Sequence, residues 1–186
     1  VAILRTLIDT KNNFWISSQG RSVQRWNKEE EQWELIPFMM EVAGSDSLVK
    51  IEFNSVFALT ELRNGNILAA EFNNGLFYFN ENGNRFEPFK FVGNEKLNGL
   101  VEIFEDRAGK LWFGGKDSFI GYNPKSFSIE YKQDWKNIKG GVGDNYFFNI
   151  NEREDGTFLM CSLPFGLLKF NPKNDKFEVL KISDEL

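Results

Sequence analysis

Two pairs of adjacent carboxylates, Glu105-Asp106 and Glu154-Asp155, have the residue types that acid–base chemistry requires. A glycosidase needs two carboxyl groups that face a cleft at about 5–9 Å from each other. Adjacent residues of a strand point to opposite faces, so neither pair can by itself be the catalytic pair. Both pairs also stand where turns between strands are expected, and Asp stabilises turns by accepting hydrogen bonds from nearby backbone amides. We therefore predict turn carboxylates and no catalytic residue.

Other kinds of site lack the residues they need. The sequence has no histidine, which excludes Ser-His and Cys-His nucleophiles and imidazole metal sites. One cysteine, Cys161, can form neither an intrachain disulfide nor a thiolate metal cluster, and in its apolar run we expect an inert core residue. The GGVG segment at 140–143 is not followed by the Gly-Lys-Ser/Thr of a phosphate loop, so it is predicted to be a connection. No calcium-loop order of residues is present either, and we predict no cofactor and no metal.

The composition narrows the class of protein. The 186 residues carry a net charge of −5, which disfavours broad electrostatic binding to nucleic acid. No apolar run approaches the roughly 18 residues of a membrane span, so we expect no membrane contact within this segment. The 20 Phe, 5 Trp, 4 Tyr and 16 Gly indicate many short strands joined by tight turns. Because the chain starts at Val1, we expect it to be an excised or processed piece.

An internal repeat organises these strands. A turn residue followed by an apolar run occurs four times, at Asn12, Gly65, Gly109 and Gly156. An aromatic-Asn pair follows each turn at a nearly constant offset: Trp26-Asn27, Phe79-Asn80, Tyr122-Asn123 and Phe170-Asn171. A third apolar residue comes six positions after each of these Asn residues, at Trp33, Phe86, Ile129 and Phe177. Agreement at this many fixed offsets indicates true repetition.

Each repeat is predicted to form four short antiparallel strands, A to D, and four such units of roughly 45 residues are typical of β-propeller blades. We predict an all-β chain made of β-propeller blades, with one propeller segment over 1–186 and blades at about 1–40, 51–91, 98–133 and 144–182. The irregular stretch at 41–52 is predicted to be a long connection. A β-sandwich is the alternative, but it would not need four copies of one pattern.

The third repeat, LVEIFEDRAGKLWFGGKDSFIGYNPKSFSIEY at 100–131, resembles the two-component regulator propeller repeat. The positions that match that family's pattern are Val101, Glu105, Asp106, Gly109, Leu111, Trp112, Gly114, Tyr122, Asn123 and Pro124. The first repeat keeps Asp9 and Trp15, whereas the second has Leu62 and the fourth has Arg153 where the acidic residue belongs. The resemblance covers nearly the whole chain and is strong in one repeat.

The resemblance implies the periplasmic sensor region of a Bacteroidetes hybrid two-component system, in which such propellers perceive oligosaccharides. Family propellers usually have more than four blades, and the first and last repeats here are as aromatic as the inner two. We therefore expect an arc of a larger propeller, whose partners are the remaining blades or a second copy of the chain.

Loop residues are the best ligand candidates, because the loops between strands B and C and between strands D and A gather on one face of a propeller. The B-to-C loops differ strongly from one repeat to the next, and divergent loops on a repeated scaffold are where recognition usually resides. A polar or carboxylated sugar would suit Arg21, Asn73, Asn74, Lys116, Asp117, Trp135 and Asn145. Trp15 and Trp112 occupy a repeated position in strand B, so burial between blades is expected for them instead of sugar stacking.

We thus predict a non-catalytic periplasmic sensor module that binds an oligosaccharide or a partner domain and relays the signal by repacking of blades or of a dimer. A propeller that only binds proteins is one alternative. A propeller glycosidase or lyase is the other.

Overall fold

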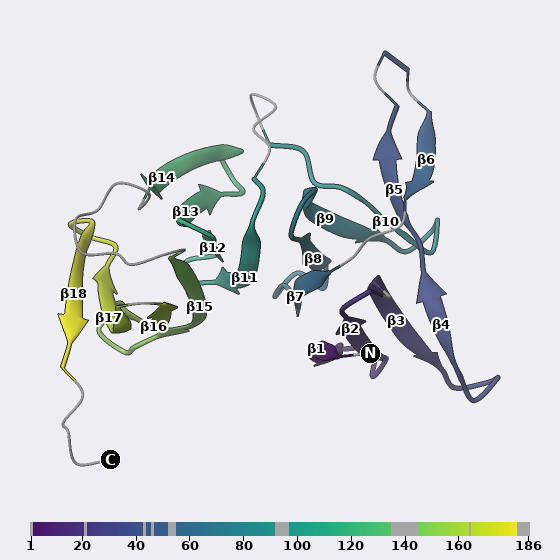
Figure 1. Cartoon of the computed structure of the whole chain (residues 1–186), viewed down its shortest axis with the longest axis horizontal. Coiled ribbons are helices and arrows are strands. Elements are labelled where there is room, and N and C mark those ends of the chain that lie inside the picture. Colours follow the sequence, from purple (N-terminus) through teal and green to yellow (C-terminus); the bar gives the residue numbers. More distant parts are fainter. Residues whose placement is uncertain are drawn as a thin grey trace. The chain divides into compact units, whose positions relative to one another are not determined.

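The computed structural model describes residues 2–20, 22–42, 44–45, 47–51, 55–91, 97–134, 145–163 and 165–181. All regular elements in these residues are β-strands, numbered β1 to β18 (Figure 1). Blade 1 consists of β1 (Ile3–Ile8), β2 (Phe14–Ser18), β3 (Ser22–Asn27) and β4 (Gln32–Ile36). Blade 2 consists of β7 (Val56–Glu61), β8 (Ile67–Glu71), β9 (Gly75–Asn80) and β10 (Arg85–Pro88).

The second half of the chain repeats this arrangement. Blade 3 consists of β11 (Leu100–Glu105), β12 (Leu111–Gly115), β13 (Ser118–Asn123) and β14 (Ser128–Asp134). Blade 4 consists of β15 (Tyr146–Glu152), β16 (Phe158–Leu163), β17 (Gly166–Asn171) and β18 (Lys176–Leu180). Within every blade, strands that follow each other in the sequence are hydrogen-bonded neighbours. The predicted fold class, an all-β chain of four propeller blades with four antiparallel strands each, is confirmed.

The stretch at 41–52 differs from the prediction, and the long connection expected there was wrong. β5 (Phe38–Glu41) and β6 (Leu48–Ile51) form an antiparallel hairpin that extends the sheet of blade 2 to six strands. Phe38 anchors the hairpin, because it pairs with Phe86 of β10 in parallel register and its ring stacks on that of Phe86 at 4.5 Å. The sequence hides this hairpin because it is an insertion that occurs in one repeat, so no second copy reveals its pattern.

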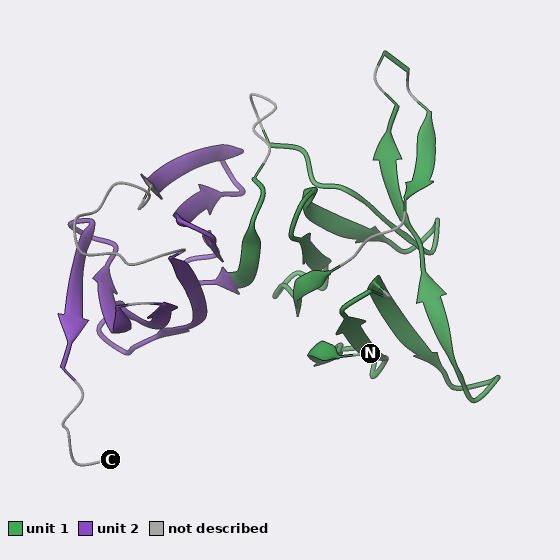
Figure 2. Cartoon of the chain, viewed as in Figure 1, with its two compact units in different colours: residues 1–103 green, residues 104–186 purple. Residues whose placement is uncertain are grey.

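The chain divides into two compact units, residues 1–103 and 104–186, with the boundary inside β11 (Figure 2). The core of unit 1 is built around Trp15, Phe38, Phe77 and Phe86. The core of unit 2 is built around Trp112, Phe119, Phe158 and Phe170. The single segment over 1–186, its blade limits and the larger ring stay predictions.

The two strand-B tryptophans hold adjacent blades together within each unit. Trp15 is 1% exposed and contacts Phe79 edge-on at 5.0 Å. Trp112 is equally buried and contacts Phe158 at 5.0 Å in the same manner. Edge-to-face pairs of this kind add roughly 0.5–1.5 kcal/mol to the burial of the rings. Their predicted burial between blades is confirmed.

Tyr131 in β14 is expected to ionise late. Its hydroxyl is buried, and within the described residues it has no hydrogen-bond partner. Burial, with a smaller contribution from the negative charge of Asp175, raises the pKa of Tyr131 to about 12. Because the folded state holds this proton more tightly than the unfolded state does, the stability linked to Tyr131 is complete below about pH 10 and is lost as the pH rises toward 12.

An alkaline titration followed by the ultraviolet absorbance of tyrosinate tests this expectation. One tyrosine should ionise near pH 12, and Tyr131→Phe should remove that step. A step that persists unchanged in Tyr131→Phe would contradict the assignment.

Candidate functional site

The acidic residues of the A-to-B turns hold the backbone and the core tryptophans. Oδ1 of Asp106 accepts hydrogen bonds from the amides of Ala108 and Lys110, both at 2.9 Å, and Oδ2 accepts one from Nε1 of Trp112 at 2.8 Å. In blade 1, Asp9 likewise accepts from the amide of Asn13 at 2.7 Å and from Nε1 of Trp15 at 2.8 Å. Asp155 accepts from the amide and the hydroxyl of Thr157. The prediction of turn chemistry for Asp106 and Asp155 is confirmed.

Blades 1 and 3 have both the turn aspartate that accepts from the indole and the strand-B tryptophan, and blades 2 and 4 have neither. All four A-to-B turns make the same backbone hydrogen bonds, and their turn residues Asn12, Gly65, Gly109 and Gly156 all have positive φ. In blades 2 and 4, where the acidic residue is replaced by Leu62 and by Arg153, the tryptophan is replaced as well, by Leu68 and by Leu159. The physical reason is that a buried indole N–H needs an acceptor and a buried carboxylate needs donors.

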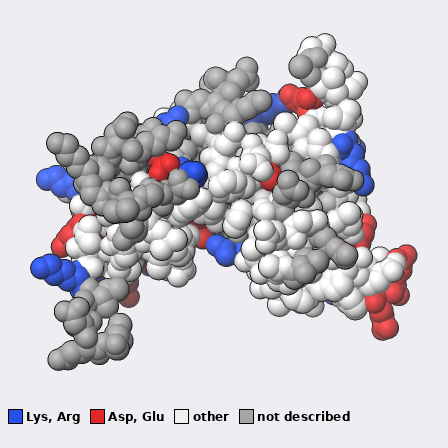
Figure 3. Space-filling view, in the orientation of Figure 1, with Lys and Arg blue, Asp and Glu red and all other residues white. Residues whose placement is uncertain are grey.

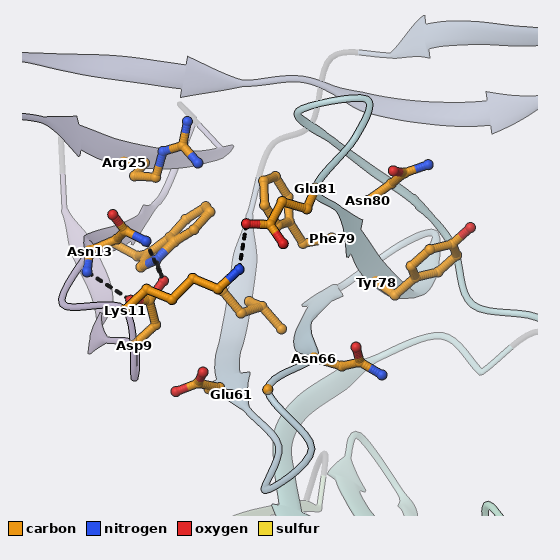
Figure 4. A pocket seen from close by; sticks show the side chains of 13 residues that line it. Asp9, Lys11, Asn13, Arg25, Glu61, Asn66, Tyr78, Phe79, Asn80 and Glu81 are labelled. Atoms are coloured by element: carbon orange, nitrogen blue, oxygen red, sulfur yellow. Dashed lines mark hydrogen bonds and ion pairs between the residues drawn. The ribbon is translucent and has the colours of Figure 1, made fainter.

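A cavity of about 440 Å³ lies between blades 1 and 2, on the side of the A-to-B turns, with all of its lining in unit 1 (Figure 4). The polar side chains that line it include Lys11, Arg25, Glu61, Asn66 and Glu81, and Tyr78 and Phe79 supply ring surface. This volume is in the range of small-molecule sites, about 300–1,000 Å³. The cavity is therefore a candidate ligand site.

Charged groups cross the cavity from one blade to the other. Lys11 of blade 1 forms an ion pair with Glu81 of blade 2, with Nζ and Oε1 at 2.5 Å (Figure 4). Glu61 accepts two hydrogen bonds from Thr10, one from the amide and one from the hydroxyl. The side chains of Lys11 and Glu81 are 62% and 68% exposed, so their mutual attraction is screened and contributes little to stability. These groups can exchange partners with a ligand at small cost.

Two other charged side chains in the cavity, Arg25 and Asp9, already have hydrogen-bond partners within the protein. Arg25 donates to Glu34 and to Asn84, both at 3.0 Å, and lies over the ring of Trp15 at 5.3 Å. Burial by itself would raise the pKa of Asp9, but the hydrogen bonds from Asn13 and Trp15 outweigh it and hold that pKa below its ordinary value. Asp9 and Arg25 are thus structural, and Asp9 is not available as a proton donor at neutral pH.

The corresponding positions in unit 2 carry different side chains around the strand-B tryptophan. Lys110 of blade 3 stands where blade 1 has Asn13, and its ammonium lies over the ring of Trp112 at 4.6 Å. Phe158 of blade 4 stands where blade 2 has the smaller Ile67, and it contacts the same indole. Gly121 of blade 3 stands where blade 1 has Arg25, and Lys110 lies over this glycine, so in unit 2 the lysine takes the arginine's place on the indole.

The described residues among those predicted to bind a ligand lie elsewhere, on the B-to-C loops and, for Asn145, on a D-to-A loop. The amides of Asn73 and Asn74, and the side chain of Asn74, donate to Oε2 of the buried Glu71 at 2.7–2.9 Å. In unit 2, Asn145 donates to Asp117 from its amide and from its side chain, and Lys116 forms a β-bridge with Tyr146. Arg21 and Trp135 lie outside the described residues. The loop residues therefore make local structural contacts, and their role in ligand binding stays a prediction.

Sequence reasoning missed the cavity. Its polar residues come from the A-to-B turns of two blades, from β3 of blade 1 and from the C-to-D turn of blade 2, so no run of sequence contains them. Within the described ranges, no cluster of three or more acidic or cysteine side chains could hold a metal ion. On the face shown in Figure 3, side chains of both charge signs are scattered among uncharged ones.

Known proteins resemble this chain in fold and not in sequence. No protein-family model and no curated protein sequence matches the chain. Among solved structures, the extracellular domain of BT3049 of Bacteroides thetaiotaomicron, assigned to a hybrid two-component system, matches 98% of this chain with a TM-score of 0.64 and 13% identity. This chain has the fold of a part of that extracellular domain. The resemblance to the two-component regulator propeller repeat is confirmed at the level of the fold.

Two further solved structures agree with this assignment of the fold. The extracellular domain of BT4673 of B. thetaiotaomicron, from another hybrid two-component system, matches 99% of this chain with a TM-score of 0.56 and 12% identity. An auxiliary nutrient binding protein of Bacteroides ovatus matches 94% with a TM-score of 0.58 and 11% identity. The chain spans 22%, 34% and 40% of the length of these three solved chains, respectively.

Proposed function

We propose that this chain is part of a non-catalytic, extracytoplasmic sensor domain of a two-component signalling protein. The observation that carries the proposal is the shared fold with extracellular domains of two-component systems over 98–99% of the chain. The turn carboxylates support a non-enzymatic role, because Asp9, Asp106 and Asp155 accept hydrogen bonds from their own turns. In the part of the chain that the structure describes, no helix is long and apolar enough to cross a membrane.

The ligand class we propose is a small oligosaccharide that binds in the cavity between blades 1 and 2. The hydroxyl groups of a sugar can donate to Glu61 and Glu81 and can accept from Lys11 and Asn66. The exposed ring of Tyr78, whose hydroxyl donates to Glu87 at 2.7 Å, offers a face for stacking. A ligand there would contact both blades, so binding would favour one packing of blade 1 on blade 2 over others, and that difference is the signal.

Thermal unfolding of the chain against a panel of plant, fungal and host oligosaccharides tests this function. A ligand at about a hundred times its dissociation constant stabilises the folded state by about 2.7 kcal/mol, which raises Tm by roughly 5–10 °C for a domain of this size. Glu81→Gln and Asn66→Ala should weaken the shift produced by an active glycan.

Asn73→Ala serves as the matched control on the B-to-C loop and should leave the shift unchanged. If the Tm shift is lost in Asn73→Ala and retained in Glu81→Gln, the ligand binds at the predicted loops and not in the cavity. No shift with any glycan would overturn the sugar ligand and leave the fold unaffected.

A protein partner is the second candidate function, and a specific observation favours it. Blade 1 exposes Ile8 at 67%, Phe14 at 38% and Trp33 at 38%. Apolar side chains gathered on one sheet face mark an interaction surface.

A further inference from the structure

Glu61 of blade 2 lines the cavity as a carboxylate whose partners are neutral. In the described residues it accepts from the amide and from the hydroxyl of Thr10 of blade 1. The same positions of the repeat in unit 2 hold Glu152 and Arg107. Glu152 also accepts from the amide of the preceding blade, but there Nε of Arg107 stands 4.0 Å from the carboxylate and offsets its charge. Unit 1 therefore leaves at the cavity a negative charge that unit 2 balances.

The other charged groups of blade 1 do not supply the missing positive charge. Asp9 accepts from the amide and the side chain of Asn13 and from Nε1 of Trp15, all of them neutral donors. The guanidinium of Arg25 lines the cavity, but it is already paired with Glu34, which is outside the lining. After these pairings the cavity retains more negative than positive charge.

Glu81 is an acidic residue that blade 2 adds at the cavity. The residue after the aromatic-Asn pair is Lys28 in blade 1, Pro124 in blade 3 and Pro172 in blade 4. The ammonium of Lys11 reaches across from blade 1 and pairs with Glu81 (Figure 4). Both side chains are more than half exposed, so the pair can open at small cost. A side chain of the protein thus shows that a primary ammonium group fits at this carboxylate.

We propose that the sugar bound in this cavity carries a free ammonium group, as a hexosamine that is not N-acetylated does. The inference rests on the proposed function, because it names the chemical class of the ligand at the same site. The ligand ammonium would replace that of Lys11 at Glu81, and the unbalanced charge of Glu61 on the same blade would attract it further (Figure 4). The displaced lysine side chain would return to solvent.

Charge distinguishes this ligand class from other sugars. An ammonium group has three N–H donors and no acceptor, which suits carboxylates, because they only accept. Hydrogen bonds between ionised groups are also stronger than those between neutral ones. A hydroxyl or an N-acetyl group can donate to the same oxygens but brings no charge, and the carboxylate of a uronic acid would be repelled. We therefore expect amino sugars to bind most tightly and acidic sugars most weakly.

Calorimetric titration with oligosaccharides of equal length tests the proposal. The probes are oligomers of glucosamine and of galactosamine, the N-acetylated form of each, and an oligomer of galacturonic acid. One of the amino sugars should bind about fivefold more tightly than its N-acetylated form, a difference of the size that an exposed ion pair contributes. The preference should shrink as the salt concentration rises, because salt screens the attraction between exposed charges.

Two substitutions and a matched control assign the preference to the cavity. Glu61→Gln removes the charge but keeps an oxygen that can accept from Thr10, so it should weaken binding of the amino sugar and leave binding of the N-acetylated sugar unchanged. Lys11→Met removes the competing ammonium and should strengthen binding of the amino sugar. Glu152→Gln changes the equivalent carboxylate of unit 2 and should bind every probe like the original chain.

The outcomes separate the ligand class from the proposed function. Amino sugars that bind no more tightly than their N-acetylated forms, or a preference that Glu61→Gln leaves intact, would overturn the ammonium-bearing ligand. If a neutral glycan binds in that case and Glu81→Gln weakens its binding, the cavity remains the sugar site. A chain that binds none of the probes and no other glycan of the panel would overturn both the ligand class and the sugar ligand itself.

Discussion

Replacing Trp112 by leucine should lower the free energy of unfolding by about 2–4 kcal/mol, and so should replacing Asp106 by leucine, but the double substitution should cost clearly less than the sum. Trp112→Leu leaves a buried carboxylate without one of its donors. Asp106→Leu leaves the indole N–H and two turn amides without their acceptor. The double variant has the Leu–Leu combination that blade 2 carries naturally as Leu62 and Leu68.

A double-mutant cycle measured by denaturant unfolding checks this expectation. We expect an interaction free energy of about 1–3 kcal/mol, the range for contacting residues of one hydrogen-bonded network. The pair Asp9 and Trp15 in unit 1 provides an independent repetition with the same atoms in contact. Additive effects in both blades would show that the repeats lose the two residues together for another reason.

Gly75→Ala should destabilise the chain by about 2–4 kcal/mol, from a left-handed backbone and a steric clash together. Gly75 has φ of +93°, which costs an L-residue energy at any site. A Cβ atom there would also stand 2.9 Å from the carbonyl oxygen of Leu97, and this backbone atom has no free rotation with which to move away.

Gly166→Ala is the matched control, because Gly166 begins strand C of blade 4 as Gly75 begins that of blade 2. Its φ is +77°, and no atom lies within 4 Å of the added Cβ, so only the backbone cost of about 1 kcal/mol is expected. The midpoints of thermal or denaturant unfolding compare the two variants. Equal losses of stability in the two variants would mean that the backbone at Leu97 moves away to accommodate the added methyl group.

The sequence determined the fold class because the repeat is local. The positive-φ turn residues Asn12, Gly65, Gly109 and Gly156 each close a hairpin whose strands follow directly in the chain. Residue type and short-range spacing are enough to predict such turns and the alternation of the strands between them. The burial of Trp15 and Trp112 also followed from the sequence, because repetition at one strand position requires a structural cause common to both blades.

Tertiary structure alone decided the candidate site. Lys11 and Glu81 lie 70 positions apart in the chain and meet across two blades, a contact that local spacing does not predict. The cavity is lined by residues of both blades, Asn13 of blade 1 and Ile67 of blade 2 among them, so its presence depends on which faces pack together. Local sequence specifies each blade, whereas the space between two blades is a property of both surfaces at once.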